Sequence, residues 1–122
     1  MAKKVLAGFV VGACMASSFA LLGATNAHAA GCNTYANVPY KSGGSAVAVG
    51  GKTGSCGASH FRVSLFHKTW RWDDEIGKQD AYDVKTVSLA AWGKPDNGWE
   101  LYTKAQDFSG ATHLSSTMTF WK

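Results

Sequence analysis

The chain has 122 residues, of which 46% are hydrophobic and 16% are charged, and its formal net charge is +4. The apolar fraction is too high for a wholly disordered chain, and the charged fraction is too low for a coiled coil. The length predicts one folded domain, because a second would have too few residues to build its own core.

Residues 1–29 have the organisation of a secretory signal peptide. A basic start precedes an apolar run from Val5 to Leu22, and the run leads to the small residues of Ala27-His28-Ala29, which a signal peptidase accepts. We expect cleavage between Ala29 and Ala30, which would leave one secreted, extracellular domain over residues 30–122. The alternative is an uncleaved membrane anchor, but glycines and serines dilute the apolar run.

The charge that remains after cleavage argues against nucleic acid as a partner. Residues 30–122 contain 10 Lys and Arg against 8 Asp and Glu, so the formal net charge falls to +2. These cations are scattered, whereas nucleic-acid binding needs a clustered basic face. We also expect no membrane span in the exported form.

Cys32 and Cys56 are the two cysteines of the exported domain. In an oxidising compartment we expect them to form a single disulfide, which the chain-entropy account values at roughly 3–4 kcal/mol. The alternative is a lipoprotein, because Ala29-Ala30-Gly31-Cys32 loosely resembles a lipid-attachment box. Such a box abuts the apolar run, whereas seven residues separate the two here.

Strands are predicted where apolar and polar residues alternate, and turns where glycine, proline and asparagine cluster. The segment from His60 to His67 alternates most clearly, with Phe61, Val63 and Leu65 on one face. Further strands are expected at 45–49, 84–92, 99–104 and 114–121, turns at 50–54 and 93–98, and an irregular or edge segment at 30–44.

Residues 69–82 follow neither the strand nor the helix period, so we expect a long exposed loop or a distorted strand there. No segment has the sustained apolar spacing of a helix. Five or more short strands at a spacing of roughly ten residues favour an all-β fold, either a small antiparallel β-sandwich or a small barrel.

The histidines do not form a recognisable catalytic set. His60 and His67 are seven residues apart, which places them on opposite faces of a strand, and His113 stands alone. We therefore expect neither an enzyme nor a bound cofactor or metal. The alternative is a hydrolase whose residues follow no familiar pattern.

The acidic run Asp73-Asp74-Glu75 could form a calcium site with Asp80 or Asp83. Its spacing differs from that of a twelve-residue calcium loop, and adjacent acids on a strand diverge. A solvated turn is the favoured interpretation.

Aromatic residues are the strongest functional signal. Residues 30–122 contain 13 of them, including all five tryptophans. Trp92, Trp121 and Phe66 occupy strand faces opposite their neighbours' apolar residues, so we expect these rings to be exposed. Some of the aromatic surface is therefore available for binding.

The sequence Trp70-Arg71-Trp72-Asp73-Asp74 is the predicted partner-binding site. Trp and Arg often dominate the binding energy of protein interfaces, and a guanidinium can hold a carboxylate through two hydrogen bonds. The alternative is that one tryptophan fills the core while the arginine pairs with Asp73 or Asp74.

A protein partner is favoured over a polysaccharide. Exposed tryptophans can stack on sugars, but sugar sites generally add planar amides, and Gln79 and Gln106 are the only glutamines in the chain. Carbohydrate binding remains the alternative.

Residues Leu65-Phe66-His67-Lys68-Thr69-Trp70-Arg71-Trp72 resemble a stretch of the tendamistat-type α-amylase inhibitors. In that family a Trp-Arg-Tyr triad on a small secreted β-sandwich enters the amylase cleft. The resemblance implies that Trp70 and Arg71 match the first two triad members, with Trp72 in place of the tyrosine.

A broader pattern extends over most of residues 30–122. It comprises Cys32, Gly50-Gly-Lys-Thr-Gly54, Cys56, Leu65, Asp74, Trp99-Glu-Leu-Tyr-Thr103 and Ser109-Gly110. This pattern resembles the small exported β-sandwich proteins of filamentous actinobacteria, and some similar proteins are thought to be adaptor subunits of secreted toxin particles. The two resemblances imply an immunoglobulin-like or tendamistat-like sandwich, and they imply a role in assembling an extracellular complex or in inhibiting a hydrolase.

Overall fold

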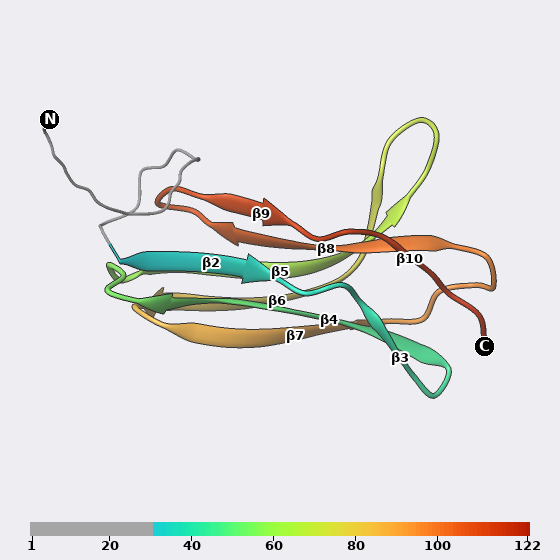
Figure 1. Ribbon diagram of the computed structural model, residues 1–122, viewed down its shortest axis with the longest axis horizontal. Coiled ribbons are helices and arrows are strands. Elements are labelled where there is room, and N and C mark those ends of the chain that lie inside the picture. The colour runs from blue at the N-terminus through green and yellow to red at the C-terminus, as the bar shows by residue number, and fades with distance from the viewer. Residues whose placement is uncertain (1–30) are drawn as a thin grey trace, which may run out of the picture.

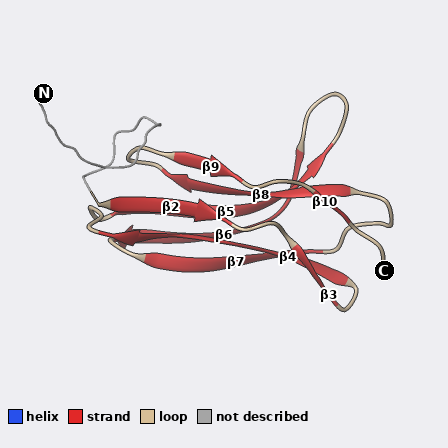
Figure 2. Cartoon of the chain, in the orientation of Figure 1, coloured by secondary structure: helices blue, strands red, loops and turns tan. Residues whose placement is uncertain are grey.

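The computed structural model describes residues 31–122, and these form nine strands and no helix (Figures 1 and 2). The strands make two antiparallel sheets that stack with the core between them, which confirms the predicted all-β sandwich. No helix in the described part is long and apolar enough to cross a membrane. The expected signal peptide and its cleavage site lie outside the described residues.

The four-stranded sheet is organised around β4 (Ser45–Gly54). On one side it pairs with β7 (Val87–Gly93), and on the other it pairs first with β2 (Cys32–Ala36) and then with β3 (Tyr40–Ser42). The segment expected to be irregular or at an edge is therefore an edge, but it consists of two short strands. They can share one side of β4 because β4 is long enough to pair with each in turn.

The five-stranded sheet has β5 (Ser59–Lys68) and β8 (Glu100–Asp107) at its centre. β6 (Asp74–Val84) pairs with the free side of β5. β9 (Thr112–Leu114) and β10 (Met118–Thr119) follow one another along the free side of β8.

The single strand expected at 114–121 is wrong, because this segment contains the end of β9, a break and then β10. At the break, Ser115 bonds to both backbone groups of one residue in β8: its N–H donates to the Thr103 carbonyl, and its hydroxyl accepts from the Thr103 N–H. A side chain thus replaces part of the ladder. Leu114 is exposed in consequence, while Phe120 beyond the break is buried.

The core consists of the inward-facing residues of both sheets. Phe61, Val63 and Leu65 are completely buried on one face of β5, as their alternation predicts. The inward faces predicted for β7 and β8 are also confirmed, because Ala91 and Leu101 are buried in the core. The other buried members of the cluster are Ala46, Ala48, Ala105 and Phe120.

The turn predicted at 50–54 is wrong, because these residues continue β4 through the middle of the sheet. Glycine is required at Gly50 and Gly51 because backbone atoms of the neighbouring strands lie too close for a side chain. A Cβ on Gly50 would lie 2.8 Å from the Tyr35 carbonyl oxygen, and one on Gly51 would overlap the Val87 carbonyl oxygen. The glycines therefore permit close approach of neighbouring backbones rather than reversal of the chain.

Lys52 follows these glycines and is fully buried between the sheets. Its ammonium donates to the Gly57 carbonyl at 3.1 Å and to the Ser59 hydroxyl at 2.6 Å, and it lies 3.4 Å from Asp107 Oδ2. The same carboxylate accepts from the Ser59 hydroxyl and from the Ser109 N–H and hydroxyl. This polar cluster joins β4 to the opposite sheet.

The predicted disulfide is confirmed. Cys32 at the start of β2 is bonded to Cys56 in the connection from β4 to β5, with the two Cα atoms 4.8 Å apart. The bond ties an edge strand to the connection between the sheets.

Residues 69–82 divide into a short loop at 69–73 and most of β6. We expected either a long exposed loop or a distorted strand, and the segment contains a form of each. The loop is exposed but short, and β6 is irregular, with register shifts opposite Ser59/Phe61 and Leu65/Phe66. The turn expected at 93–98 corresponds to the connection from β7 to β8, which passes from one sheet to the other.

Candidate partner-binding site

The predicted site lies on the aromatic loop, which we define as residues 69–73. The loop joins β5 to β6 beyond their last pair, His67 with Asp74, and stands away from the body of the sandwich (yellow-green in Figure 1). Because it continues a hairpin rather than a sheet face, it forms a convex projection from one end of the molecule.

The side chains at the tip of the loop are exposed. Trp70 is 89% exposed and Trp72 is 66% exposed, and Arg71 between them is also exposed. The Arg71 guanidinium lies 5.1 Å from the ring centroid of Trp70 and 5.0 Å from that of Trp72, so it makes a cation–π contact with each indole. These contacts hold the three side chains together as one group.

Asp73 anchors the base of the loop. Its Oδ1 accepts from the Thr69 N–H at 3.1 Å, and its Oδ2 accepts from the Tyr102 hydroxyl of β8 at 2.6 Å. The Thr69 hydroxyl also donates to the Trp72 carbonyl. The loop is thus closed on itself and tied to the neighbouring strand.

The electrostatics of this anchor favour an ionised carboxylate. The hydrogen bonds from Tyr102 and then from the Thr69 backbone hold the pKa of Asp73 below its usual value. Partial burial, followed by the bond to Asp73, raises the pKa of Tyr102 to about 12. At neutral pH the phenol therefore stays protonated and donates to the carboxylate.

The five residues predicted to bind a partner thus have different surroundings. Trp70, Arg71 and Trp72 point into solvent, whereas Asp73 is occupied by the anchor. Asp74 is exposed at the first position of β6. Within residues 31–122, Arg71 forms no ion pair with Asp73 or Asp74, and neither Trp70 nor Trp72 fills the core. The alternative in which a tryptophan packs inside and the arginine pairs with a neighbouring acid is therefore wrong for this loop.

A shallow hollow of about 200 Å³ lies at the base of the loop. Its floor and walls combine the Asp73–Tyr102 pair with hydroxyl groups from the segment after β9. The lining residues are Lys68, Asp73, Tyr102, Leu114, Ser115 and Thr117. The exposed lining of the hollow is mainly apolar, and neither Trp70 nor Trp72 is part of it.

The acids proposed for a calcium site do not gather at one place. Asp73 bonds to Tyr102, Glu75 accepts from Ser64 at 2.5 Å, and Asp80 accepts from Arg62 and contacts His60. No cluster of three His, Cys, Asp or Glu residues suited to a metal occurs among the described residues.

The histidines pack against rings. His60 lies between Tyr82 and Phe108, with ring centroids 4.3 and 4.1 Å away, and His67 stacks on Trp99 at 3.8 Å. Phe66 similarly stacks on Tyr102, at 5.4 Å. These aromatic residues are engaged within the molecule, which separates them from the indoles of the aromatic loop.

Tyr102 and Lys68 are parts of the site that sequence reasoning missed. The alternation in β8 places Tyr102 opposite the buried Leu101 and so indicates an outward-facing ring. It does not indicate the contact with Asp73, which is 29 residues away along the chain. That contact requires β5 to pair with both β6 and β8.

The sequence matches no family model, and comparison with curated proteins finds no significant relative.

Proposed function

We propose that this protein is a secreted, non-enzymatic binding protein whose aromatic loop engages a protein partner. In this role it acts as an adaptor subunit of an extracellular protein or toxin complex, or as an inhibitor of a hydrolase. The observation that carries the proposal is the exposed Trp70-Arg71-Trp72 group on an anchored, projecting loop.

The chemistry of the group suits a partner with a concave, partly acidic site. Two indoles offer large apolar surfaces that lose little rotamer freedom on binding, and the guanidinium between them can form two hydrogen bonds to a carboxylate. Because Arg71 makes no ion pair in residues 31–122, its donors remain available to a partner.

The anchoring of the loop lowers the entropic penalty of binding. Asp73 holds both the Thr69 backbone and Tyr102, so the loop's base is ordered before any partner arrives. Ordering an interface side chain on binding costs roughly 0.5–1.5 kcal/mol, and a loop that is already ordered avoids part of this penalty.

Capture of partners from the producing culture tests the proposal. The wild-type protein is the bait, and a Trp70→Ala/Arg71→Ala variant should lose at least about tenfold in affinity for the captured protein. Trp121→Ala/Lys122→Ala is the matched control, because Trp121 is also an exposed indole and is followed by a cation. Equal binding by both variants and wild type would refute a role for the loop.

Inhibition of an α-amylase is the specific alternative that the loop's composition and projection favour. Titration of the enzyme with wild-type protein should then give inhibition that the Trp70→Ala/Arg71→Ala variant lacks. Full amylase activity at every inhibitor concentration would exclude this function and leave assembly of a complex.

Carbohydrate binding is the second alternative, and the exposure of Trp70 and Trp72 favours it, because exposed indoles can stack on sugar rings. Retention of the wild-type protein on insoluble polysaccharide, with loss of retention in Trp72→Ala, is the expected result for this function. Passage of both proteins through the column would exclude it for the polysaccharide used.

A further inference from the structure

The outer face of the four-stranded sheet is free of charge. Along β4, the outward positions alternate with the core residues and are Ser45, Val47, Val49, Gly51 and Thr53. Their register partners on β2, β3 and β7 are tyrosine, tryptophan, serine, alanine and asparagine residues. No Lys, Arg, Asp or Glu occupies an outward position in this described sheet.

An aromatic row crosses this face. In the register of the sheet, Val47 lies between Tyr40 on β3 and Trp92 on β7. Val47 is fully buried although it points away from the core, while Tyr40 is 52% exposed and Trp92 is 57% exposed. Two large exposed rings therefore flank a valine that has no exposed surface of its own, and Val38, also exposed, precedes the row.

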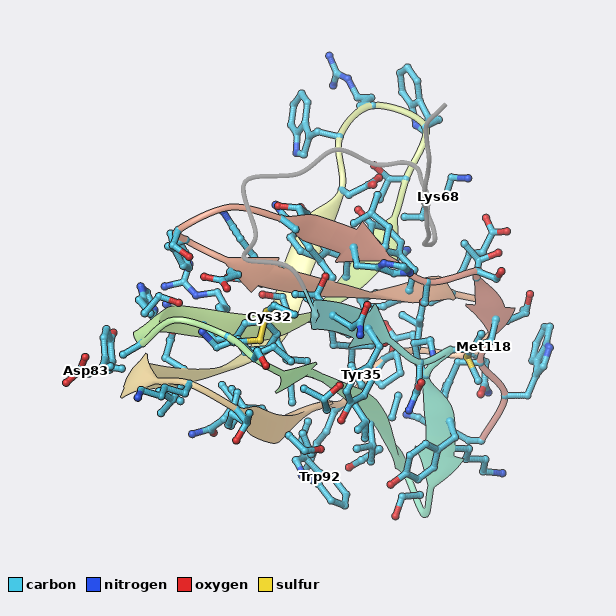
Figure 3. All side chains as sticks on the ribbon, turned by 60° about the vertical axis from the view of Figure 1, so that its left-hand side comes forward. Cys32, Tyr35, Lys68, Asp83, Trp92 and Met118 are labelled. Carbon is cyan, nitrogen blue, oxygen red and sulfur yellow. A yellow bond between two sulfur atoms is a disulfide. The ribbon has the colours of Figure 1, made fainter. Side chains whose placement is uncertain are left out.

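Figure 3 shows Trp92 projecting from β7 on the side opposite the aromatic loop, with Tyr35 on the neighbouring part of the same sheet. Within residues 31–122, neither Trp92 nor Tyr40 takes part in a ring stack or cation–π contact. These rings therefore have no aromatic partner in the part of the chain that the structure describes.

The outer face of the five-stranded sheet is different. It carries both signs of charge, for example Arg62 with Asp80 and Lys104 near Phe66, and its rings stack on one another. On that face, charged groups pair with one another and aromatic rings stack within the molecule. Within the described strands, the outer face of the four-stranded sheet instead carries hydroxyl and amide groups and no charged side chain.

Self-association is the form of binding that such a face favours. When two copies meet through the same face, a charge close to the two-fold axis meets its own copy, and a face with no charge avoids this repulsion. The nearby Lys41 pairs with the inward-facing Ala46 and therefore belongs to the other side of the sheet.

The size of the face suits a modest dimer. Ten residues of β4 at a rise of about 3.3 Å and three strands at a spacing of about 4.8 Å give a footprint of roughly 33 by 14 Å. Two such faces in contact remove on the order of 1,000 Å² of accessible surface, which is near the lower limit for a specific interface.

We propose that the occupant of this face is a second copy of the chain, so that the protein forms a two-fold dimer through the exposed rings of Tyr40 and Trp92. The aromatic loop leaves the other sheet and remains free in each copy. The dimer therefore presents two loops on opposite sides, and it can bridge two partner sites or bind one repetitive partner with higher avidity. This inference stands independently of what the loop binds.

Sedimentation equilibrium of protein produced from the full chain tests the proposal. We expect a concentration-dependent dimer, and we expect Trp92→Asp and Tyr40→Asp each to raise its dissociation constant at least about tenfold, because each change buries two like charges. Trp121→Asp is the matched control and should dimerise as wild type does, since Trp121 is exposed elsewhere on the molecule.

A charge-exchange experiment separates loss of the dimer from loss of the fold. Trp92→Asp and Trp92→Lys should each be monomeric alone and should form a heterodimer when mixed, which misfolded proteins would not do. The proposal is overturned if the wild-type protein remains a monomer up to about 0.5 mM. It is also overturned if Trp92→Asp folds and dimerises with unchanged affinity, or if this face captures a different protein while the wild type stays monomeric.

Discussion

The buried pair of Lys52 and Asp107 yields the sharpest prediction about stability. We expect Lys52→Met to lower the free energy of unfolding by about 3 kcal/mol, because it leaves a buried carboxylate without its cation. The loss falls at the lower end of the usual range of about 3–5 kcal/mol, since Ser59 and Ser109 still donate to Asp107. Folded domains have total stabilities of about 5–15 kcal/mol, so the variant should remain folded.

A second substitution tests the reasoning. Lys52→Met/Asp107→Asn removes both charges, and the amide can still bond to Ser59 and Ser109. We therefore expect the double variant to regain about 2 kcal/mol relative to Lys52→Met. Lys41→Met is the matched control and should change stability by less than about 0.5 kcal/mol, because Lys41 is exposed on β3.

Urea unfolding followed by tryptophan fluorescence measures all four proteins. The intact disulfide must be retained throughout, so that only the polar cluster differs among them. If the double variant is no more stable than Lys52→Met, the loss does not come from an uncompensated charge. A Lys52→Met variant as stable as Lys41→Met would show that the cluster contributes nothing to folding.

Three further predictions concern pH, the disulfide and the loop anchor. Burial by itself would raise the pKa of Asp107, but hydrogen bonds and the charge of Lys52 lower it to about 2. The contribution of Asp107 to stability, about 2 kcal/mol, should thus be present above pH 4 and be lost as the pH falls towards 2. Urea unfolding at a series of pH values should show that the free energy of unfolding falls with pH in this range and falls less steeply in Asp107→Asn. The same pH dependence in wild type and Asp107→Asn would contradict the assignment. Cys32→Ser/Cys56→Ser should lower stability by about 3.5 kcal/mol, since the bond closes a loop with a sequence separation of 24, and a reductant should then destabilise the wild type but not the variant. Tyr102→Phe removes the hydroxyl that donates to the Asp73 carboxylate, so titration with the captured partner should show an affinity reduced about threefold to tenfold. Thermal unfolding should show a stability within about 1 kcal/mol of wild type. Unchanged affinity would mean that the anchor does not order the loop.

Local patterns were sufficient where one strand has a buried and an exposed face. Phe61, Val63 and Leu65 alternate with polar residues, so their burial follows from the two-residue period of a strand. The charges around Trp70 and Trp72 favoured exposure, but the alternative that one of them fills the core was excluded only by the structure.

Glycine shows where local reasoning fails. A glycine pair between short apolar runs has the same composition whether it reverses the chain or allows a neighbouring backbone to approach. Gly50 and Gly51 serve the second purpose, and only the positions of Tyr35 and Val87 reveal it. The same error placed Lys52 in a turn, whereas the continuous strand directs its side chain between the sheets.

The sequence by itself determined the class of fold and the disulfide between Cys32 and Cys56, and it singled out Trp70-Arg71-Trp72 as the candidate site. Each of these follows from spacing or composition within a short segment, or from a count of residues. Only the tertiary structure decided that Tyr102 anchors the loop, that Lys52 meets Asp107, and that one sheet face carries no charge. These features join residues far apart in the chain, and they depend on strand order and register, which no local pattern specifies.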